Sequence, residues 1–224
     1  MKRSELNSVI ESAAEFARSH GFLLPPFAFW SPQEWGAKGH EADEIRECML
    51  GWDLTDFGSD DFQRVGLVLF TIRNGHFSDP RYTKPYCEKM LISEEDQITP
   101  MHFHWSKSED IIVRGGGNLA VQVYNSTEEE DLDTSDVTVS VDGVARTVRA
   151  GDTITLAPGE SIFLPRGLYH KFWGEQGKVL IGEVSTVNDD RSDNRFHGAV
   201  GRFPEVEEEE EPRYLLFWEY PKAR

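Results

Sequence analysis

A regular run of short apolar segments, separated by turn signals, occupies the chain from Phe62 to Ser185. The segments have the length of strands and are rich in Val, Ile, Thr and aromatic residues, which favours β-structure. Asp142-Gly143 stands between two of them and predicts a tight type I′ hairpin. Short strands at even spacing are typical of an antiparallel sandwich or barrel. We expect strands at 65–72, 88–92, 97–104, 110–114, 119–124, 137–141, 144–148, 153–156, 161–164, 169–173, 179–185 and 214–220.

The first 60 residues predict helices. The segment Ser4–Arg18 carries an apolar stripe at helical spacing. Ser31-Pro32-Gln33-Glu34 has the pattern of a capping box with Pro at the first helical position. A third helix is expected within Glu41–Leu50. The chain is therefore expected to form one domain, with a helical arm over residues 1–60 that packs on a β-barrel over residues 61–224.

Two motifs bring three histidines and a glutamate within reach of one metal ion. His102, His104 and Glu109 follow H-x-H-x4-E spacing, and His170 ends the pattern G-x5-P-x-G-x2-H that begins at Gly159. Side chains two residues apart on a strand face the same way, so His102 and His104 point into one cavity. His170 has to come from another strand. Imidazole and carboxylate ligands suit Mn, Fe, Co, Ni or Zn, and four of them leave two adjacent positions for water or substrate on an octahedral metal.

Both motifs resemble those of the cupin superfamily, whose fold is a double-stranded β-helix, or jelly-roll, barrel. Two positions depart from the common cupin pattern, because Asp96 stands where Gly is frequent and Gly174 stands where Asn is frequent. The wider sequence is similar to bacterial D-lyxose ketol-isomerases, from the first residues to about Tyr220. The segments that carry this similarity are Lys2–Asn7, Leu24–Trp30, Thr99–Trp105, Val187–Asp190 and Arg202–Glu205.

The resemblance implies an enzyme that interconverts D-lyxose and D-xylulose, with D-mannose and D-fructose as further substrates. A proton must then leave C2 and arrive at C1, so a general base must lie near the metal. The resemblance makes Glu205 the leading base. Lys107 falls between two expected metal ligands and is expected to polarise O1 or to shuttle the proton, unless it is a surface lysine. Lys89, Asp190 and Arg195 are expected to bind sugar hydroxyls, unless the loop around Asp190 is only a capped turn.

The expected metal is Mn, one ion per chain, because a hard and redox-inactive ion suits two sugar oxygens; Co, Ni, Fe and Zn are alternatives. A single metal favours a cis-enediol route, since hydride shifts in other sugar isomerases generally use two metals. Two other functional classes stay open, a cupin metal oxidoreductase or dioxygenase and a non-enzymatic sugar-binding cupin. The residue chemistry alone indicates a metal cupin that acts on a small polar molecule.

Charge and composition limit the partners. The chain has 23 basic and 40 acidic side chains and a net charge of −17, which disfavours nucleic acid and anionic membranes. No apolar run approaches the roughly 18 residues of a membrane span. Two cysteines make no disulfide framework, so we expect a cytoplasmic protein. The acidic runs 128–131 and 207–211 are expected to be solvated loops. A homodimer is expected from the aromatic residues Phe27, Phe29 and Trp30, unless these cover the barrel's own outer sheet.

Overall fold

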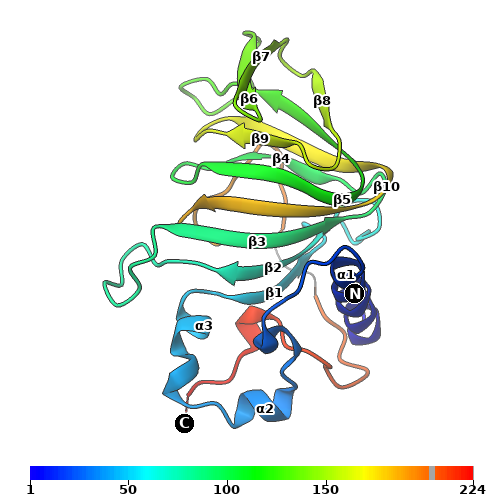
Figure 1. Ribbon diagram of the computed structural model, residues 1–224, viewed down its shortest axis with the longest axis vertical. Helices are drawn as coiled ribbons and strands as arrows, with labels where there is room; N and C mark the ends of the chain where they lie inside the picture. The colour runs from blue at the N-terminus through cyan, green and yellow to red at the C-terminus, as the bar shows by residue number, and fades with distance from the viewer. Residues whose placement is uncertain (202–204, 224) are drawn as a thin grey trace.

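The computed structural model describes residues 1–201 and 205–223, and in this part of the chain eleven antiparallel strands form one continuous sheet. Figure 1 shows these strands stacked along the long axis of the molecule, with β1 at one end and β7 at the other. The strands are β1 (Gly51–Thr55), β2 (Leu67–Arg73), β3 (Tyr86–Ser93), β4 (Thr99–Phe103), β5 (Glu109–Tyr124), β6 (Val137–Val141), β7 (Val144–Val148), β8 (Thr153–Leu156), β9 (Ser161–Leu164), β10 (Tyr169–Thr186) and β11 (Arg195–Phe196).

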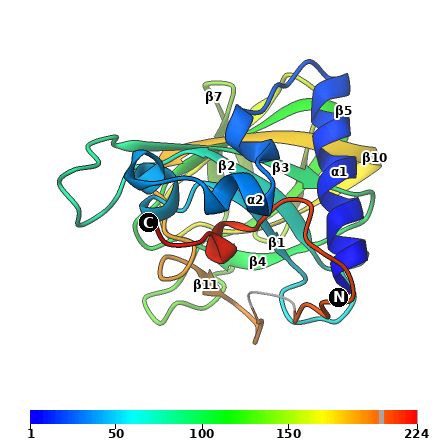
Figure 2. The same ribbon diagram turned by 90° about the horizontal axis from the view of Figure 1, so that it is seen from below.

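The sheet folds over on itself because β5 and β10 are long and take part in two layers. The two halves of β5 have different partners. The half before glycines 115–117 pairs with β9, and the half after them pairs with β8. The pairing of β10 with β5 shifts register between Glu175 and Val179, where the two strands bend together. The other end of β10 pairs with β3, and its beginning pairs with β4. In Figure 2 strands β3 and β4 accordingly lie apart, in the two layers.

The alternation of side chains along the strands creates two apolar cores. Leu69 and Leu91 face the space between the layers, where they join Val121 and Phe172 in the inner core. Their neighbours on the same strands face the other side of the sheet. Residues of both faces are therefore buried in β2 and β3. The functional side chains described below lie on the inner face.

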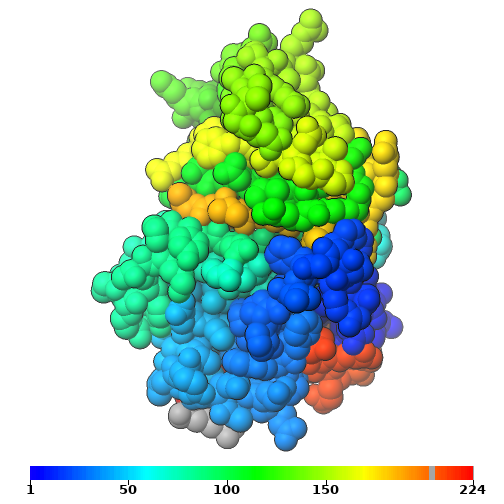
Figure 3. Space-filling model, viewed as in Figure 1, coloured from blue at the N-terminus to red at the C-terminus, as the bar shows by residue number. Residues whose placement is uncertain are grey.

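Helices cover the outer face of the sheet at the β1 end. They are α1 (Arg3–Ser19), α2 (Pro32–Gly36) and α3 (Asp43–Glu47), with 3-10 turns at Pro26–Phe29, His40–Ala42 and Phe217–Glu219. Leu6 and Ile10 of α1 are fully buried in a second core that includes Phe70 and Leu180 of the sheet, and burial of each stabilises the fold by about 1.5–3 kcal/mol. Figure 3 shows the N-terminal helical region, in blue, packed directly against the rest of the molecule. No helix among the described residues is long and apolar enough to cross a membrane.

The expected mainly β, cupin-like fold is confirmed. The hairpin at Asp142-Gly143 is present between β6 and β7, and both residues have the positive φ that a type I′ turn requires. The capping box is also present, because Ser31 Oγ accepts the backbone N–H of Glu34 at 3.2 Å and the Glu34 carboxylate accepts that of Ser31 at 2.8 Å. β1 lies within the first 60 residues, so the sheet begins before the expected boundary at residue 61.

Two predictions of secondary structure are wrong. The segment 214–220 forms no strand: one isolated bridge joins Leu216 to Trp52, and a 3-10 turn follows. The separate strands expected at 110–114 and 119–124 form one strand, β5, and those expected at 169–173 and 179–185 form β10. Gly116 and Gly177 instead adopt positive φ within β5 and β10 and let both strands bend.

The acidic run 207–211 is exposed, as expected, but it also makes specific contacts with α1. Glu207 pairs with Lys2 through the backbone, and the Glu208 carboxylate accepts two hydrogen bonds from the buried guanidinium of Arg3, at 2.5 and 2.8 Å. Asn7 donates to the side chain of Glu210 at 2.6 Å. These contacts hold the C-terminal segment against the first helix.

Candidate metal and sugar site

Three imidazoles meet between the two layers. His102 lies in β4, His104 follows that strand, and His170 lies at the start of β10 directly opposite His102. One ring nitrogen of each lies within 4.8 Å of the others. The three residues are 7, 6 and 1% exposed in the same order, so the cluster is buried. The sequence-based expectation that His170 comes from another strand is met.

Backbone carbonyls hold the three rings in one tautomer. The Nδ1 atoms of His102, His104 and His170 lie 2.7, 2.8 and 3.0 Å from the carbonyl oxygens of Pro100, Asp193 and Leu168. A carbonyl can only accept, so each Nδ1 carries the proton and each Nε2 offers a lone pair. Such orientation by a second hydrogen bond is usual for histidines that bind a metal.

Glu109, the first residue of β5, brings a carboxylate to the same point. Its Oε1 lies 3.1 Å from Nε2 of His170 and 3.5 Å from Nε2 of His104. The buried Nε2 of His170 has no hydrogen-bond partner among the described residues. An inward lone pair without a donor, beside a carboxylate, is what a divalent cation would satisfy. The donor set fits a divalent metal, and the imidazoles can bind one.

Burial and neighbouring charges shift the pKa values of His102, His104 and Glu109 in the directions that favour metal binding. Burial, together with the neighbouring imidazoles, lowers the pKa of His102 well below its usual value, and burial and the Lys107 ammonium lower the pKa of His104. Burial opposes ionisation of Glu109, but Lys107 and the two nearby histidines still hold its pKa well below its usual value. At neutral pH His102 and His104 are therefore neutral and Glu109 is ionised.

Two buried lysines and two carboxylates extend the site. Lys107 Nζ lies 2.7 Å from Glu109 Oε2 and 2.9 Å from Glu183 Oε1. Lys89 Nζ lies 3.2 Å from Asp190 Oδ2 and 3.5 Å from Glu183 Oε1. Burial opposes the charge of both lysines, but the facing carboxylates raise the pKa of each, and that of Lys107 strongly. All five side chains line one pocket with His102 and His104, so the structure brings the expected residues Lys107, Lys89 and Asp190 together.

Sequence reasoning missed several residues of this pocket. Glu183 and Asp53 are buried acids on β10 and β1 that line it, although neither belongs to a motif. Asp193 is buried beside it, and its carboxylate accepts the backbone N–H groups of Ser106 and Lys107 at 2.8 and 2.9 Å. The sequence did carry one signal for Glu183, because an acidic residue within an otherwise apolar strand indicates a buried and functional carboxylate.

The loop that contains Asp190 is anchored from below by a buried asparagine. Asn74 and Asn188 exchange two hydrogen bonds between side chain and backbone, at 2.8 and 3.0 Å. Lys89 Nζ donates to the side chain of Asn188 at 2.9 Å. The loop is therefore a fixed wall of the pocket and more than the capped turn that was the alternative.

Two expected site residues lie elsewhere. Arg195 in β11 donates to the Glu130 carboxylate at 3.0 Å and does not line the pocket. Glu130 also accepts the indole N–H of Trp105 at 2.7 Å, while the other residues of the run 128–131 are exposed, as expected. Glu205 is exposed and outside the pocket, and its backbone carbonyl accepts the N-terminal ammonium of Met1 at 2.9 Å. The preceding residues 202–204 lie outside the described part of the chain.

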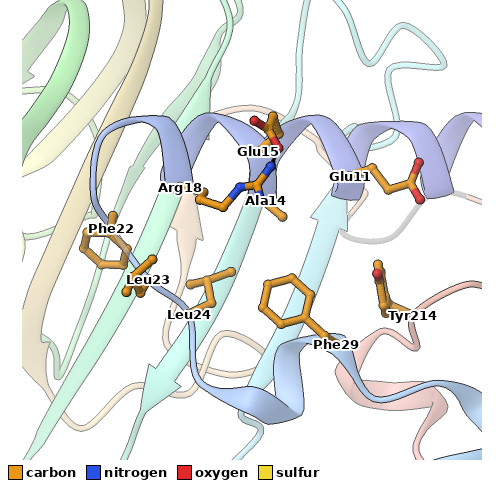
Figure 4. Close-up of a pocket in the computed structure, with 9 residues that line it drawn as sticks. All are labelled: Glu11, Ala14, Glu15, Arg18, Phe22, Leu23, Leu24, Phe29 and Tyr214. Atoms are coloured by element: carbon orange, nitrogen blue, oxygen red, sulfur yellow. Dashed lines mark hydrogen bonds and ion pairs between the residues drawn. The ribbon is translucent and has the colours of Figure 1, made fainter.

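A second hollow, of about 400 Å³, lies between α1 and the segment 22–29 (Figure 4). It is lined mainly by apolar side chains, among them Leu24 and Phe29, with Glu15 and Arg18 on its helical side. It contains none of the histidines described above. The structure therefore offers one site with metal chemistry in the described residues, and it is the pocket between the layers.

Comparison with known proteins gives this site its context. A family model described as D-lyxose isomerase matches residues 1–220. A D-lyxose/D-mannose isomerase of Serratia proteamaculans is 48% identical over 223 residues, which cover 98% of each chain. The chain belongs to the D-lyxose isomerase family. Another D-lyxose/D-mannose isomerase of this family, from Escherichia coli O157:H7, is 46% identical over 227 residues and is covered completely, as is this chain.

Solved structures share the fold at much lower identity. An L-ribose isomerase of Cellulomonas parahominis superposes with a TM-score of 0.61 at 15% identity, over 92% of this chain and 98% of that one. The L-ribose isomerase of Acinetobacter sp. DL28 in complex with L-ribose gives 0.59 at 17% identity, over 88% and 93%. The D-lyxose isomerase family member described here is therefore a cupin-like enzyme, an aldose–ketose isomerase. The resemblance noted in the sequence is confirmed.

Proposed function

We propose that this isomerase interconverts D-lyxose and D-xylulose, and D-mannose and D-fructose, through a cis-enediol with one divalent metal ion per chain. The observation that carries the proposal is the convergence of three buried imidazoles on Glu109, next to a pocket that a second buried carboxylate, Glu183, also lines. The two relatives named D-lyxose/D-mannose isomerase support both pairs of sugars. The family assignment favours this function over an oxidoreductase or a sugar-binding protein without activity.

A divalent metal bound by His102, His104, Glu109 and His170 would polarise two adjacent sugar oxygens and stabilise the negative charge that develops on them. We propose Mn, because a hard and redox-inactive ion suits oxygen ligands, with Co, Ni, Fe and Zn as alternatives. The described residues contain a single cluster of potential metal ligands. One metal favours proton transfer through an enediol over a hydride shift.

Glu183 is a better placed general base than Glu205. Glu183 is 3% exposed, lines the pocket of the imidazoles and receives a hydrogen bond from Lys107 at 2.9 Å. A base must lie within hydrogen-bonding reach of the proton that it abstracts. Glu205 would have to move from the surface to meet this condition. We therefore assign the proton transfer from C2 to C1 to Glu183 and keep Glu205 as the alternative base.

Lys107 supports the reaction as an ammonium group. Its raised pKa keeps it charged at neutral pH, so it donates a hydrogen bond to a sugar oxygen and does not accept the proton from C2. Lys89 and Asp190 face the same pocket and are proposed to bind sugar hydroxyls. Arg195 could take part only after its guanidinium left Glu130.

The metal requirement can be tested by removal and return. Protein stripped with a chelator is expected to convert no D-lyxose, and addition of Mn is expected to restore D-xylulose formation. Parallel additions of Co, Ni, Fe and Zn at equal free concentration rank the metals. Full activity in protein shown by elemental analysis to be free of metal would contradict the proposal.

A homodimer and a cytoplasmic location are further proposals. Phe27 packs on Phe70, and Trp30 packs edge-on against Trp35, so these two aromatics cover the chain's own core. The argument for a dimer now depends on Phe29 and Leu23, which are 43 and 77% exposed. Light scattering on the intact protein tests it. Both cysteines are buried free thiols, which suits a reducing compartment, and cell fractionation tests the location.

A further inference from the structure

One buried polar group of the pocket has no role in the account above. Thr99, at the start of β4, is 3% exposed and lines the same pocket as His102 and Glu183. Its hydroxyl oxygen is buried and forms no hydrogen bond with any residue in the described part of the chain. Buried hydroxyl groups almost always have a partner, because leaving one unsatisfied destabilises the fold.

A β-bulge turns Thr99 toward the pocket. His102 lies opposite His170 and Thr99 lies opposite Phe172, so three residue steps on β4 match two steps on β10. In a regular strand, residues three apart face opposite sides. The extra residue in β4 therefore puts Thr99 on the face of the metal-ligating histidines. Bulges next to active sites commonly redirect a side chain in this way.

The distance along the strand suits a small sugar. Three residues of β-strand span at most about 10 Å, so Thr99 and the imidazoles belong to one small chamber. Phe172 and Leu91 supply apolar lining in the same chamber. The Thr99 hydroxyl has no hydrogen-bond partner among the described residues. It can both donate a hydrogen bond to a sugar hydroxyl and accept one from it.

We propose that the Thr99 hydroxyl is a substrate-binding group, which holds a sugar hydroxyl on C3, C4 or C5, away from the reacting carbons. This inference rests on the proposed function of the pocket as a sugar site. It explains why a threonine occupies a position where valine, of nearly the same shape, would leave no hydroxyl unsatisfied. It also makes Thr99 a determinant of specificity, because a site built to bond a hydroxyl rejects the analogue that lacks it.

Thr99→Val tests the proposal, with Thr99→Ser as the matched control that keeps the hydroxyl. Thr99→Val is expected to raise KM for D-lyxose about tenfold and to leave the melting temperature equal or higher. Thr99→Ser is expected to stay within about threefold of the wild-type KM. Among 3-, 4- and 5-deoxy-D-lyxose, one sugar should show the same KM with wild type and with Thr99→Val. An unchanged KM for D-lyxose in Thr99→Val, or a clear drop in its melting temperature, would overturn the proposal.

Binding without turnover separates this inference from the proposed function. D-arabinitol, the alcohol that corresponds to D-lyxose, cannot isomerise, and calorimetry measures its Kd with metal-loaded protein. Weaker binding by Thr99→Val than by Thr99→Ser supports the role of Thr99 even if wild type fails to convert D-lyxose. Equal Kd values in the two variants overturn the role of Thr99 even if wild type is an active isomerase.

Discussion

The carboxylate of Asp193 accepts the backbone N–H of Lys107 at 2.9 Å, although the two residues are far apart in sequence. The same carboxylate accepts the N–H of Ser106, and the Asp193 carbonyl accepts Nδ1–H of His104. One residue on the loop after β10 therefore orients the ring of His104, a candidate metal ligand, and holds the bend that carries the buried Lys107. The metal motif is complete only when this loop is in place.

Asp193→Ala is expected to weaken metal binding about 10–100-fold, the usual cost of losing a group that orients metal ligands. Without the Asp193 carboxylate, the backbone N–H groups of Ser106 and Lys107 lose their acceptor. The bend between His104 and Glu109 is then less rigidly held. Metal titration followed by elemental analysis measures the loss. Asp136→Ala, which removes an exposed carboxylate, serves as the control. Wild-type metal affinity in Asp193→Ala would show that the bend holds its shape without this loop.

Glu183→Gln and Glu205→Gln distinguish the two candidate bases. Glu183→Gln is expected to keep its metal and lose about 10²–10⁴-fold in turnover, the range for a lost general base. Glu205→Gln is expected to retain activity, because its carboxylate is exposed outside the pocket. Rates of D-xylulose formation at saturating D-lyxose decide between them. Loss of turnover in Glu205→Gln alone would return the role of base to Glu205.

Glu109→Gln is expected to lose metal and activity together. The amide lacks the charge that balances Lys107, which lies 2.7 Å from Glu109, and it is a poorer ligand than the carboxylate. Metal content after dialysis, measured beside turnover, tests the expectation. Glu128→Gln is an exposed control. A fully metallated but inactive Glu109→Gln protein would assign Glu109 to the chemistry and not to metal binding.

The stabilisation that the Arg3–Glu208 ion pair gives to the folded protein should depend on pH. The Arg3 guanidinium lowers the pKa of Glu208 in the folded protein. The stabilisation is therefore present above the unfolded pKa of about 4.3 and is lost as the pH falls through the lower folded value. Wild type is expected to melt at a higher temperature than Glu208→Gln at pH 7, and the difference should shrink below pH about 4. Glu207→Gln is the control, and a difference that persists unchanged in acid would contradict the assignment.

The clustering of His102, His104 and His170 was predictable from sequence because strand periodicity and motif spacing are local. His102 and His104 share a face by alternation alone, and tight-turn chemistry placed the hairpin at Asp142-Gly143 correctly. Glu183 and Asp193 were not predictable in the same way. Their roles come from the pairing of β10 and from a loop that returns to the first motif, which no local pattern records.

The errors have a physical cause as well. Separate strands were expected at 110–114 and 119–124, but pairing with β10 carries β5 through glycines 115–117. The acidic run 207–211 is exposed, as its composition predicts, but no local pattern records the contact of Glu208 with the buried Arg3 on α1. The pairing of β5 overrides the local preference of the sequence, and the contact of Glu208 with Arg3 adds to it.

Proton exchange during isomerisation tests the central claim most directly. Metal-loaded protein is incubated with D-lyxose in D2O, and proton NMR follows the product, beside a metal-stripped sample. Metal-dependent D-xylulose with deuterium at C1 is the predicted result, because an enediol intermediate exposes the transferred proton to a titratable carboxylate. The absence of ketose from both D-lyxose and D-mannose in the metal-loaded sample would contradict the account.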